Sequence, residues 1–152
     1  MARISHRESR EVAVSTERMF NLVADVERYP EFVPLLRKAK IVGRFDSGYE
    51  TEQTLALGPL AHCFRTRTRL DRPHSVVVTS EDRSFCVFDI RWSFTPTSER
   101  CCHIDFSLKC EPRSIWLRPV GDVLVGQMAL TMVHAFATRA WTLDRVQDRL
   151  NG

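Results

Sequence analysis

The last third of the chain carries the longest helical pattern in the sequence, and it limits the folds that the rest can form. Residues 120–150 contain no proline and two glycines, Gly121 and Gly126, and apolar residues recur every three or four positions. At about 100° per residue, one face of this predicted helix carries Val125, Met128, Met132, Phe136, Leu143, Val146 and Leu150. A second apolar strip, which includes Val133 and Trp141, leaves only a narrow polar wedge. Such a helix needs other structure around most of its circumference, so we expect the preceding chain to grip it.

The middle of the chain has the pattern of an antiparallel sheet. Short runs rich in apolar and β-branched residues alternate with turn signals such as Asp46-Ser47-Gly48 and Gly58-Pro59. The predicted strands cover residues 39–45, 49–57, 60–70, 75–79, 85–94 and 100–110. Alternation in the last two runs places Trp92, Phe94 and Phe106 on one side of the sheet.

The start of the chain adds a strand and two short helices. Residues 3–14 predict a strand, Ser15 is the predicted N-cap of the following helix, and Pro30 predicts the end of that helix near Asp25 to Arg28. Segment 29–34 holds two aromatic residues and two prolines, which is typical of a helical lid over a core or of a pocket rim. The pattern predicts an α+β fold, in which a curved antiparallel sheet of about seven strands surrounds a long C-terminal helix, with two short helices after the first strand.

Composition bounds the class of protein. A length of 152 residues with 43% hydrophobic and 27% charged residues is typical of one globular domain, which we place at residues 1–152. Residues 1–10 contain no apolar run, so we expect no signal peptide and a cytoplasmic protein. The five cysteines lack metal-ligand spacing and predict reduced thiols, with no metal and no catalytic cofactor. The net charge of +3 permits contact with RNA or anionic lipid without requiring either, and we predict no DNA partner.

Four segments of the chain match the pattern of a known family. They are residues 19–34 (MFNLVADVERYPEFVP), 64–68 (FRTRT), 92–94 (WSF) and 132–140 (MVHAFATRA). In these segments the chain resembles the coenzyme Q-binding proteins and the bacterial ribosome-association toxins, which belong to the START-like superfamily with its helix-grip fold. It departs from their pattern at Leu35-Leu36, where an aromatic–cysteine pair is common, and at Arg83-Ser84-Phe85, where Gly-Pro-Phe is common.

The resemblance implies a deep apolar cavity between the sheet and the terminal helix, able to hold a prenylated quinone. The residues that suit its wall and mouth are Tyr29, Phe32, Trp92, Phe94, Phe106, Met128, Met132, Phe136 and Arg139. Aromatic rings and flexible methionines make adaptable apolar walls. The alternative is that the same side chains fill the core and leave no cavity.

Three functions follow from the resemblance. The first is non-catalytic binding or transport of a hydrophobic ligand, ubiquinone or a similar prenylated lipid, which supports respiratory electron transport through peripheral contact with the inner face of the cell membrane. The second is a ribosome-association toxin that binds the large ribosomal subunit and blocks subunit joining. The third is a polyketide cyclase-like enzyme, in which His62, Asp89, His103 and Asp105 act as acid–base groups only if they share a cavity. The sequence holds no motif of a known catalytic class, so we predict no catalytic residues.

Arg139 interrupts the apolar face of the predicted helix. A guanidinium without a partner is costly in such a position. It therefore forms an ion pair with an acid such as Glu31, contacts the head group of a ligand, or reaches water.

Basic residues mark two further segments. One is a basic ridge along a predicted strand and the turn after it, formed by Arg65, Arg67, Arg69 and Arg72. This ridge is either a solvated sheet face paired with neighbouring acids or a patch for ribosomal RNA or an anionic membrane. The other segment holds Trp116 and Leu117 beside Arg113 and Arg118. We expect it to pack into the core, with membrane contact as the alternative.

Overall fold

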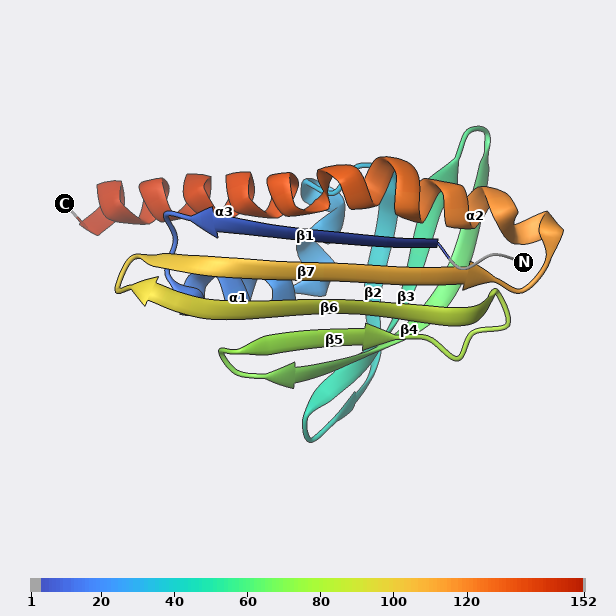
Figure 1. The fold of residues 1–152 in the computed structure, drawn as a ribbon, viewed down its shortest axis with the longest axis horizontal. Helices are drawn as coiled ribbons and strands as arrows, with labels where there is room; N and C mark the ends of the chain where they lie inside the picture. The colour runs from blue at the N-terminus through green and yellow to red at the C-terminus, as the bar shows by residue number, and fades with distance from the viewer. Residues whose placement is uncertain (1–3, 152) are drawn as a thin grey trace.

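Seven antiparallel strands form one sheet that curves around a C-terminal helix (Figure 1). The computed structural model describes residues 4–151, apart from the side chains of Ile4, Gln127, Met128 and Leu130. The strands are β1 (Ile4–Val12), β2 (Leu36–Phe45), β3 (Gly48–Leu57), β4 (Leu60–Asp71), β5 (Ser75–Thr79), β6 (Phe85–Ser98) and β7 (Cys101–Pro112). Their order across the sheet is β1-β7-β6-β5-β4-β3-β2. Figure 1 shows β2, β3 and β4 crossing the direction of β6 and β7, which is the curvature that a sheet needs to enclose a helix.

Two short helices connect β1 with β2, as predicted. They are α1 (Thr16–Ala24) and the 3₁₀ helix η1 (Val26–Glu31). The predicted N-cap is confirmed, because Ser15 Oγ accepts a hydrogen bond from the backbone N–H of Arg18 at 3.3 Å. η1 lies along the edge strand β2, where the backbone N–H of Ile41 donates to Glu27 Oε2 at 3.1 Å. The helical lid therefore also protects one exposed edge of the sheet.

The long C-terminal helix is confirmed, but it is not regular throughout. After β7 the chain forms the 3₁₀ turn η2 (Ile115–Leu117), α2 (Arg118–Asp122), the π-helical segment η3 (Val123–Met128) and α3 (Ala129–Asn151). The buried positions described along these segments are Val120, Gly121, Leu124, Ala129, Met132, Val133, Phe136 and Ala140. The five-residue step from Leu124 to Ala129 falls within the π-helical turn, whose hydrogen bonds span one residue more than those of an α-helix. Before Ala129, the face that the structure buries is therefore shifted by one residue from the predicted apolar face. Leu124 is buried there, whereas the predicted Val125 is only partly buried.

The inner face of the sheet and the helices enclose one hydrophobic core. Alternate residues of β7 show the pattern most clearly, since Cys102, Ile104, Phe106, Leu108 and Cys110 are each at most 2% exposed. The cysteines are free thiols, as predicted. Burial raises the pKa of Cys102 to about 11 and that of Cys110 to about 12, so both behave as small apolar groups.

The last turns of α3 are not gripped, although the predicted apolar face of this helix continued to Leu150. Leu143, Val146 and Leu150 are 42%, 49% and 76% exposed. β7 has 12 residues and spans about 40 Å, whereas the helical stretch from Arg118 to Asn151 is about 50 Å long. Its C-terminal end consequently passes the ends of β1 and β7 (Figure 1).

One expectation fails at the other end of this stretch. Trp116 does not pack into the core but is 88% exposed. Within residues 4–151, no single helix has the length and apolar character needed to cross a membrane. Two consecutive helical segments, Ile115–Gly126 and Thr131–Asn151, reach that length and apolar character only when they are taken together, and a 47° bend separates them.

Candidate ligand-binding site

Phe136 is the centre of an aromatic cluster between the sheet and α3. Its ring is fully buried, and its centroid lies 4.9 Å from those of Tyr29, Phe32 and Trp92. Trp92 on β6 contacts Phe106 on β7 with a centroid distance of 4.6 Å. We use the name aromatic cluster for these five residues, which come from η1, the turn after it, two strands and the terminal helix.

Local sequence explains how each ring reaches the cluster. Trp92 and Phe106 are direct partners in the antiparallel register of β6 and β7, so their side chains leave the same face of the sheet. Tyr29 is held by its phenol, which donates to the carbonyl oxygen of Val23, and by its own carbonyl oxygen, which accepts from the N–H of Val33 at 2.8 Å. Burial, followed by the charges of Tyr49 and Asp25, raises the pKa of Tyr29 well above 10. Tyr29 therefore remains a protonated donor.

The structure brings most of the predicted ligand-binding residues to this one place. Phe94 stacks beside Trp92 at 6.3 Å, and Met132 is 8% exposed in the same core. The side chain of Met128 lies outside the described residues. Proximity alone does not test ligand binding, so the role of these residues stays a prediction.

Arg139 forms the ion pair that the sequence predicted as one alternative. Its Nη2 lies 2.5 Å from Glu31 Oε1, and its guanidinium carbon lies 5.4 Å from the centre of the Phe32 ring. The pair ties α3 to the end of η1, directly beside the aromatic cluster. Arg139 Nε is buried and has no hydrogen-bond partner among the described residues. One N–H of this guanidinium is therefore available to a ligand.

His6 is partly exposed but places a second buried polar atom, its Nε2, at the cluster, and the sequence reasoning missed it. Its ring lies 6.2 Å from that of Phe106, and its Nε2 is buried without a hydrogen-bond partner among the described residues. Glu8 Oε2 is 3.5 Å from this nitrogen. Strand alternation counted back from Val12 puts His6 on the inward face, and this was the available signal.

A groove between α1 and α3 leads to Arg139. Its volume is about 460 Å³, which is within the range of small-molecule pockets. Arg139, Ala140, Leu143 and Asp25 are among its lining residues, and an ion pair between Arg18 and Asp144 bridges its two helices. The ion pair of Arg139 with Glu31 thus stands between this groove and the aromatic cluster.

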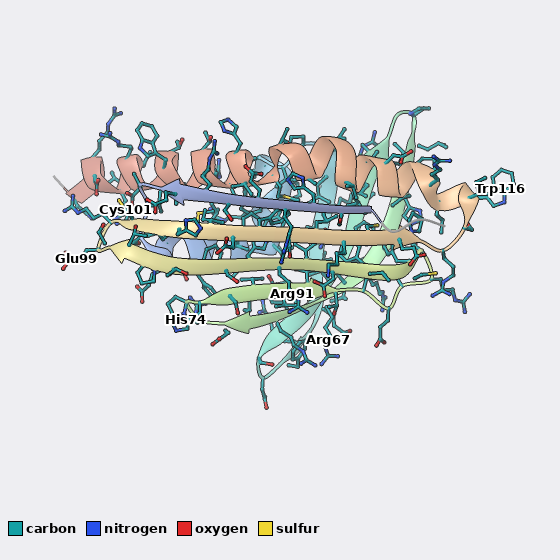
Figure 2. All side chains as sticks on the ribbon, in the orientation of Figure 1. Arg67, His74, Arg91, Glu99, Cys101 and Trp116 are labelled. Atoms are coloured by element: carbon teal, nitrogen blue, oxygen red, sulfur yellow. The ribbon has the colours of Figure 1, made fainter. Side chains whose placement is uncertain are left out.

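The basic ridge is largely a solvated sheet face. Arg65 and Arg67 form ion pairs with Glu52 at 3.6 Å and Glu50 at 3.3 Å, their neighbours across the β3–β4 ladder. Arg72 donates a hydrogen bond to Asn21 Oδ1 and lies over the ring of Phe20. Arg69 is exposed and has no ion-pair partner within the described part of the chain. Arg67 lies far from α3 in Figure 2, so the ridge and the aromatic cluster are separate places.

The four acid–base candidates do not converge. Asp89 pairs with Arg91, and His103 lies near Glu11 and Asp105, all on outward-facing positions of the sheet. His62 is directed to the inner face, where its Nε2 is 2.8 Å from Ser84 Oγ. Ser84 Oγ in turn donates to Asp82 Oδ1 at 2.7 Å, and Asp82 Oδ2 accepts from the N–H of Arg65 at 2.9 Å. Because Asp82 contacts the serine rather than the histidine, this chain of hydrogen bonds fixes the β5–β6 loop and lacks the order of a catalytic triad.

No metal site is formed among the residues that the structure describes. No three His, Cys, Asp or Glu side chains gather where they could hold an ion.

Comparison with protein families assigns this fold. Residues 12–137 match the family described as polyketide cyclase / dehydrase and lipid transport. The chain belongs to this family. Its fold agrees with that of the aromatase/cyclase Zhui from Streptomyces sp. R1128, with a TM-score of 0.77 and 12% identity over 91% of this chain and 94% of Zhui. A START superfamily protein from Mycobacterium smegmatis matches with a TM-score of 0.73 and 18% identity over 91% of this chain and 98% of that protein. These identities establish the START-like helix-grip fold alone.

Relatives with higher sequence identity fall into two groups. The ribosome association toxin RatA of Pseudomonas aeruginosa is 33% identical over 122 residues, which are 80% of this chain and 85% of RatA. The coenzyme Q-binding protein COQ10 homolog B of Xenopus laevis is 27% identical over 142 residues, which are 91% of this chain and 58% of that protein. The resemblance to both groups is confirmed.

Proposed function

We propose that the protein binds a hydrophobic ligand, ubiquinone or a similar prenylated lipid, between α3 and the sheet, and that it carries this ligand without changing it chemically. The observation that carries the proposal is the aromatic cluster with two buried nitrogen atoms at its edges, His6 Nε2 and Arg139 Nε, which have no hydrogen-bond partner among the described residues. Relatives that are named for coenzyme Q binding support the same ligand class.

The chemistry of the cluster suits a quinone. A flat quinone ring packs favourably against aromatic faces and edges, and its carbonyl oxygens accept hydrogen bonds but donate none. An N–H of Arg139, and one of His6 when Nε2 carries the proton, supply such donors. The prenyl chain then takes the place of core contacts along Met132 and Phe136, where apolar side chains already exclude water.

Entry of the ligand requires that η1 separate from α3. The ion pair that holds them together is partly solvated, with Arg139 27% and Glu31 51% exposed, so it contributes only about 0.2–1 kcal/mol to closure. Arg139, one member of this pair, also lines the groove between α1 and α3. We therefore propose this groove as the entrance and the Arg139–Glu31 pair as its latch.

A fluorescence titration tests the proposal. Trp92 becomes the sole indole in the variant Trp116→Phe/Trp141→Phe, because the chain has three tryptophans. A short-chain ubiquinone analogue is expected to quench Trp92 in a saturable way, and His6→Phe or Arg139→Met to weaken binding about 2–10-fold through loss of one hydrogen bond. His103→Phe, a histidine on the outer face of β7, is the matched control. Quenching that does not saturate, together with a purified protein that carries no extractable lipid, would contradict the proposal.

A second candidate function rests on a different observation. RatA of Pseudomonas aeruginosa has higher identity to this chain than the coenzyme Q-binding relatives and matches it over more of its own length. We propose ribosome binding through the basic ridge as the alternative, with Arg69, which is exposed and has no ion-pair partner among the described residues, as the cation that contacts RNA. Cosedimentation with large ribosomal subunits is then expected to fall with added salt and with Arg69→Glu, whereas Arg100→Glu in the exposed β6–β7 turn is the control. Equal cosedimentation of both variants would remove the ridge from this role.

A further inference from the structure

One end of the molecule presents apolar side chains to solvent. Trp116 is 88% exposed and Ile115 is 67% exposed in η2, and Figure 2 shows Trp116 projecting at the end of the long axis. The β3–β4 turn rises beside α2 at the same end (Figure 1), α2 contacts β3, and this turn adds Leu60 with 70% exposure. We use the name apolar tip for Leu60, Ile115 and Trp116.

Basic residues surround the apolar tip. Arg113 and Arg118 flank η2, and residues 112–119 contain no acid. Arg113 donates from Nε to the carbonyl oxygen of Arg83 at 3.1 Å and from Nη2 to that of Phe85 at 3.0 Å. These bonds fix the base of η2 and bring the exposed Arg83 to the same end of the sheet. The tip therefore combines a rigid support with a positive rim.

We infer that the apolar tip docks the protein on an anionic membrane surface. Tryptophan and arginine together are typical of protein segments that lie at the level of lipid head groups, where the indole is inserted and the guanidinium groups meet phosphate. The tip is a convex projection of three side chains, which is too small for a stable protein interface of about 800 Å² per partner. A bilayer accepts such a projection because it deforms around each side chain.

The inference goes beyond the proposed function: docking through the tip would hold the protein at a bilayer surface, whereas the groove between α1 and α3 is lined by the C-terminal part of α3, at the other end of the long axis. The tip is formed at the N-terminal end of the helical stretch that covers the aromatic cluster. A protein docked through it would keep the outer face of the sheet and the C-terminal end of α3 in water (Figure 1).

Vesicle flotation tests the docking without added ligand. The full chain is expected to float with vesicles of phosphatidylcholine and phosphatidylglycerol, and to float less with phosphatidylcholine alone or at raised salt. Trp116→Ala is expected to lower the vesicle affinity about tenfold, and Arg118→Ala to lower it about fivefold. Trp141→Ala is the matched control, because Trp141 is also exposed, at 47%, but stacks on Arg145 in the distal part of α3.

Tryptophan fluorescence locates the contact independently. The fluorescence emission of Trp116 is expected to shift to shorter wavelength when anionic vesicles are added. Trp116→Phe should abolish this shift, whereas Trp141→Phe should retain it.

Three outcomes would each overturn the inference: equal flotation of wild type and Trp116→Ala, equal binding to neutral and anionic vesicles, or loss of flotation in Trp141→Ala. A Trp116→Ala variant that binds ribosomal subunits less but vesicles equally would reassign the tip to RNA. The quinone titration of Trp92 in the absence of vesicles reports separately on the proposed function, so failure of one can be told from failure of the other.

Discussion

Replacing Phe136 with alanine removes the ring on which three other rings pack. Phe136 is fully buried, and Tyr29, Phe32 and Trp92 each lie 4.9 Å from it. A buried Phe→Ala substitution costs about 3–5 kcal/mol through lost transfer energy and the cavity it leaves. Because three edge-to-face or tilted partners lose their contact together, we expect a value near the middle of this range or above, about 4 kcal/mol.

That loss is large compared with the whole stability of the protein. A domain of this size has a free energy of unfolding of about 5–15 kcal/mol, so the variant should keep its fold with a much lower urea midpoint, shifted by about 2 M for an m-value near 2 kcal/mol/M. Equilibrium urea unfolding of lipid-free protein, followed by far-UV circular dichroism, measures the difference. Ligand has to be removed first, because a bound ligand raises the apparent stability of the native state.

Two controls separate packing from general effects on the helix. Val146→Ala, at a position that is 49% exposed on α3, is expected to cost no more than about 0.5 kcal/mol. Phe136→Leu keeps most of the volume and is expected to cost about 1–1.5 kcal/mol. A cost below about 1.5 kcal/mol for Phe136→Ala would refute the reasoning, because it would mean that the ring borders open space rather than close-packed neighbours.

Three further predictions concern the latch, the thiols and acid stability. A double-mutant cycle of Glu31→Gln and Arg139→Met should give a coupling energy of about 0.2–1 kcal/mol, since both side chains are partly exposed; zero coupling would show that the pair does not stabilise the closed arrangement. With a thiol reagent at neutral pH, the exposed Cys63 and Cys86 should react in the native protein, whereas the buried Cys102 and Cys110 should react only on unfolding; five equal rates would contradict their burial. Burial raises the pKa of Asp82, but hydrogen bonds from Ser84 and from the backbone of Arg65 outweigh it and lower that pKa below the ordinary 3.8. The stabilisation by Asp82 is therefore fully present above the ordinary pKa of 3.8 and lost as pH falls through its lowered folded-state pKa. Wild type and Asp82→Asn should consequently differ in melting temperature at pH 7 and converge in acid, below the ordinary pKa; a constant difference would contradict this assignment.

Local signals were sufficient for most of the fold. Asp46-Ser47-Gly48 and Gly58-Pro59 turn the chain where the sequence predicted, and the strands on either side end within a few residues of their predicted limits. Period-two alternation fixed the inward face of β6 and β7, because a half-buried strand exposes every second residue. The exposed end of α3 was not predictable in this way, since a helical face shows which side is apolar but not how far the sheet extends.

The site was partly predictable for a different reason. An arginine within an apolar face needs a partner or water, and this requirement gave an acid such as Glu31 as one of three alternatives for Arg139, the one that the structure shows. His6 was missed because β1 is short of apolar residues, so its inward face is not evident from hydrophobicity. Trp116 was placed wrongly because burial of a loop depends on tertiary contacts, and the hydrogen bonds of Arg113 to the β5–β6 loop hold η2 outside the core.

The π-helical segment η3 gives the protein a place where its length can change. Deleting one residue from Val123–Met128 would turn the five-residue step into a regular four-residue step and leave Val120 and Phe136 on the same buried side. A deletion within α3 would instead rotate every later residue by about 100° relative to the sheet, so Arg139 would no longer meet Glu31. A chain shortened by one residue in η3 should therefore keep both its core and its latch, and length differences among relatives should concentrate in this turn.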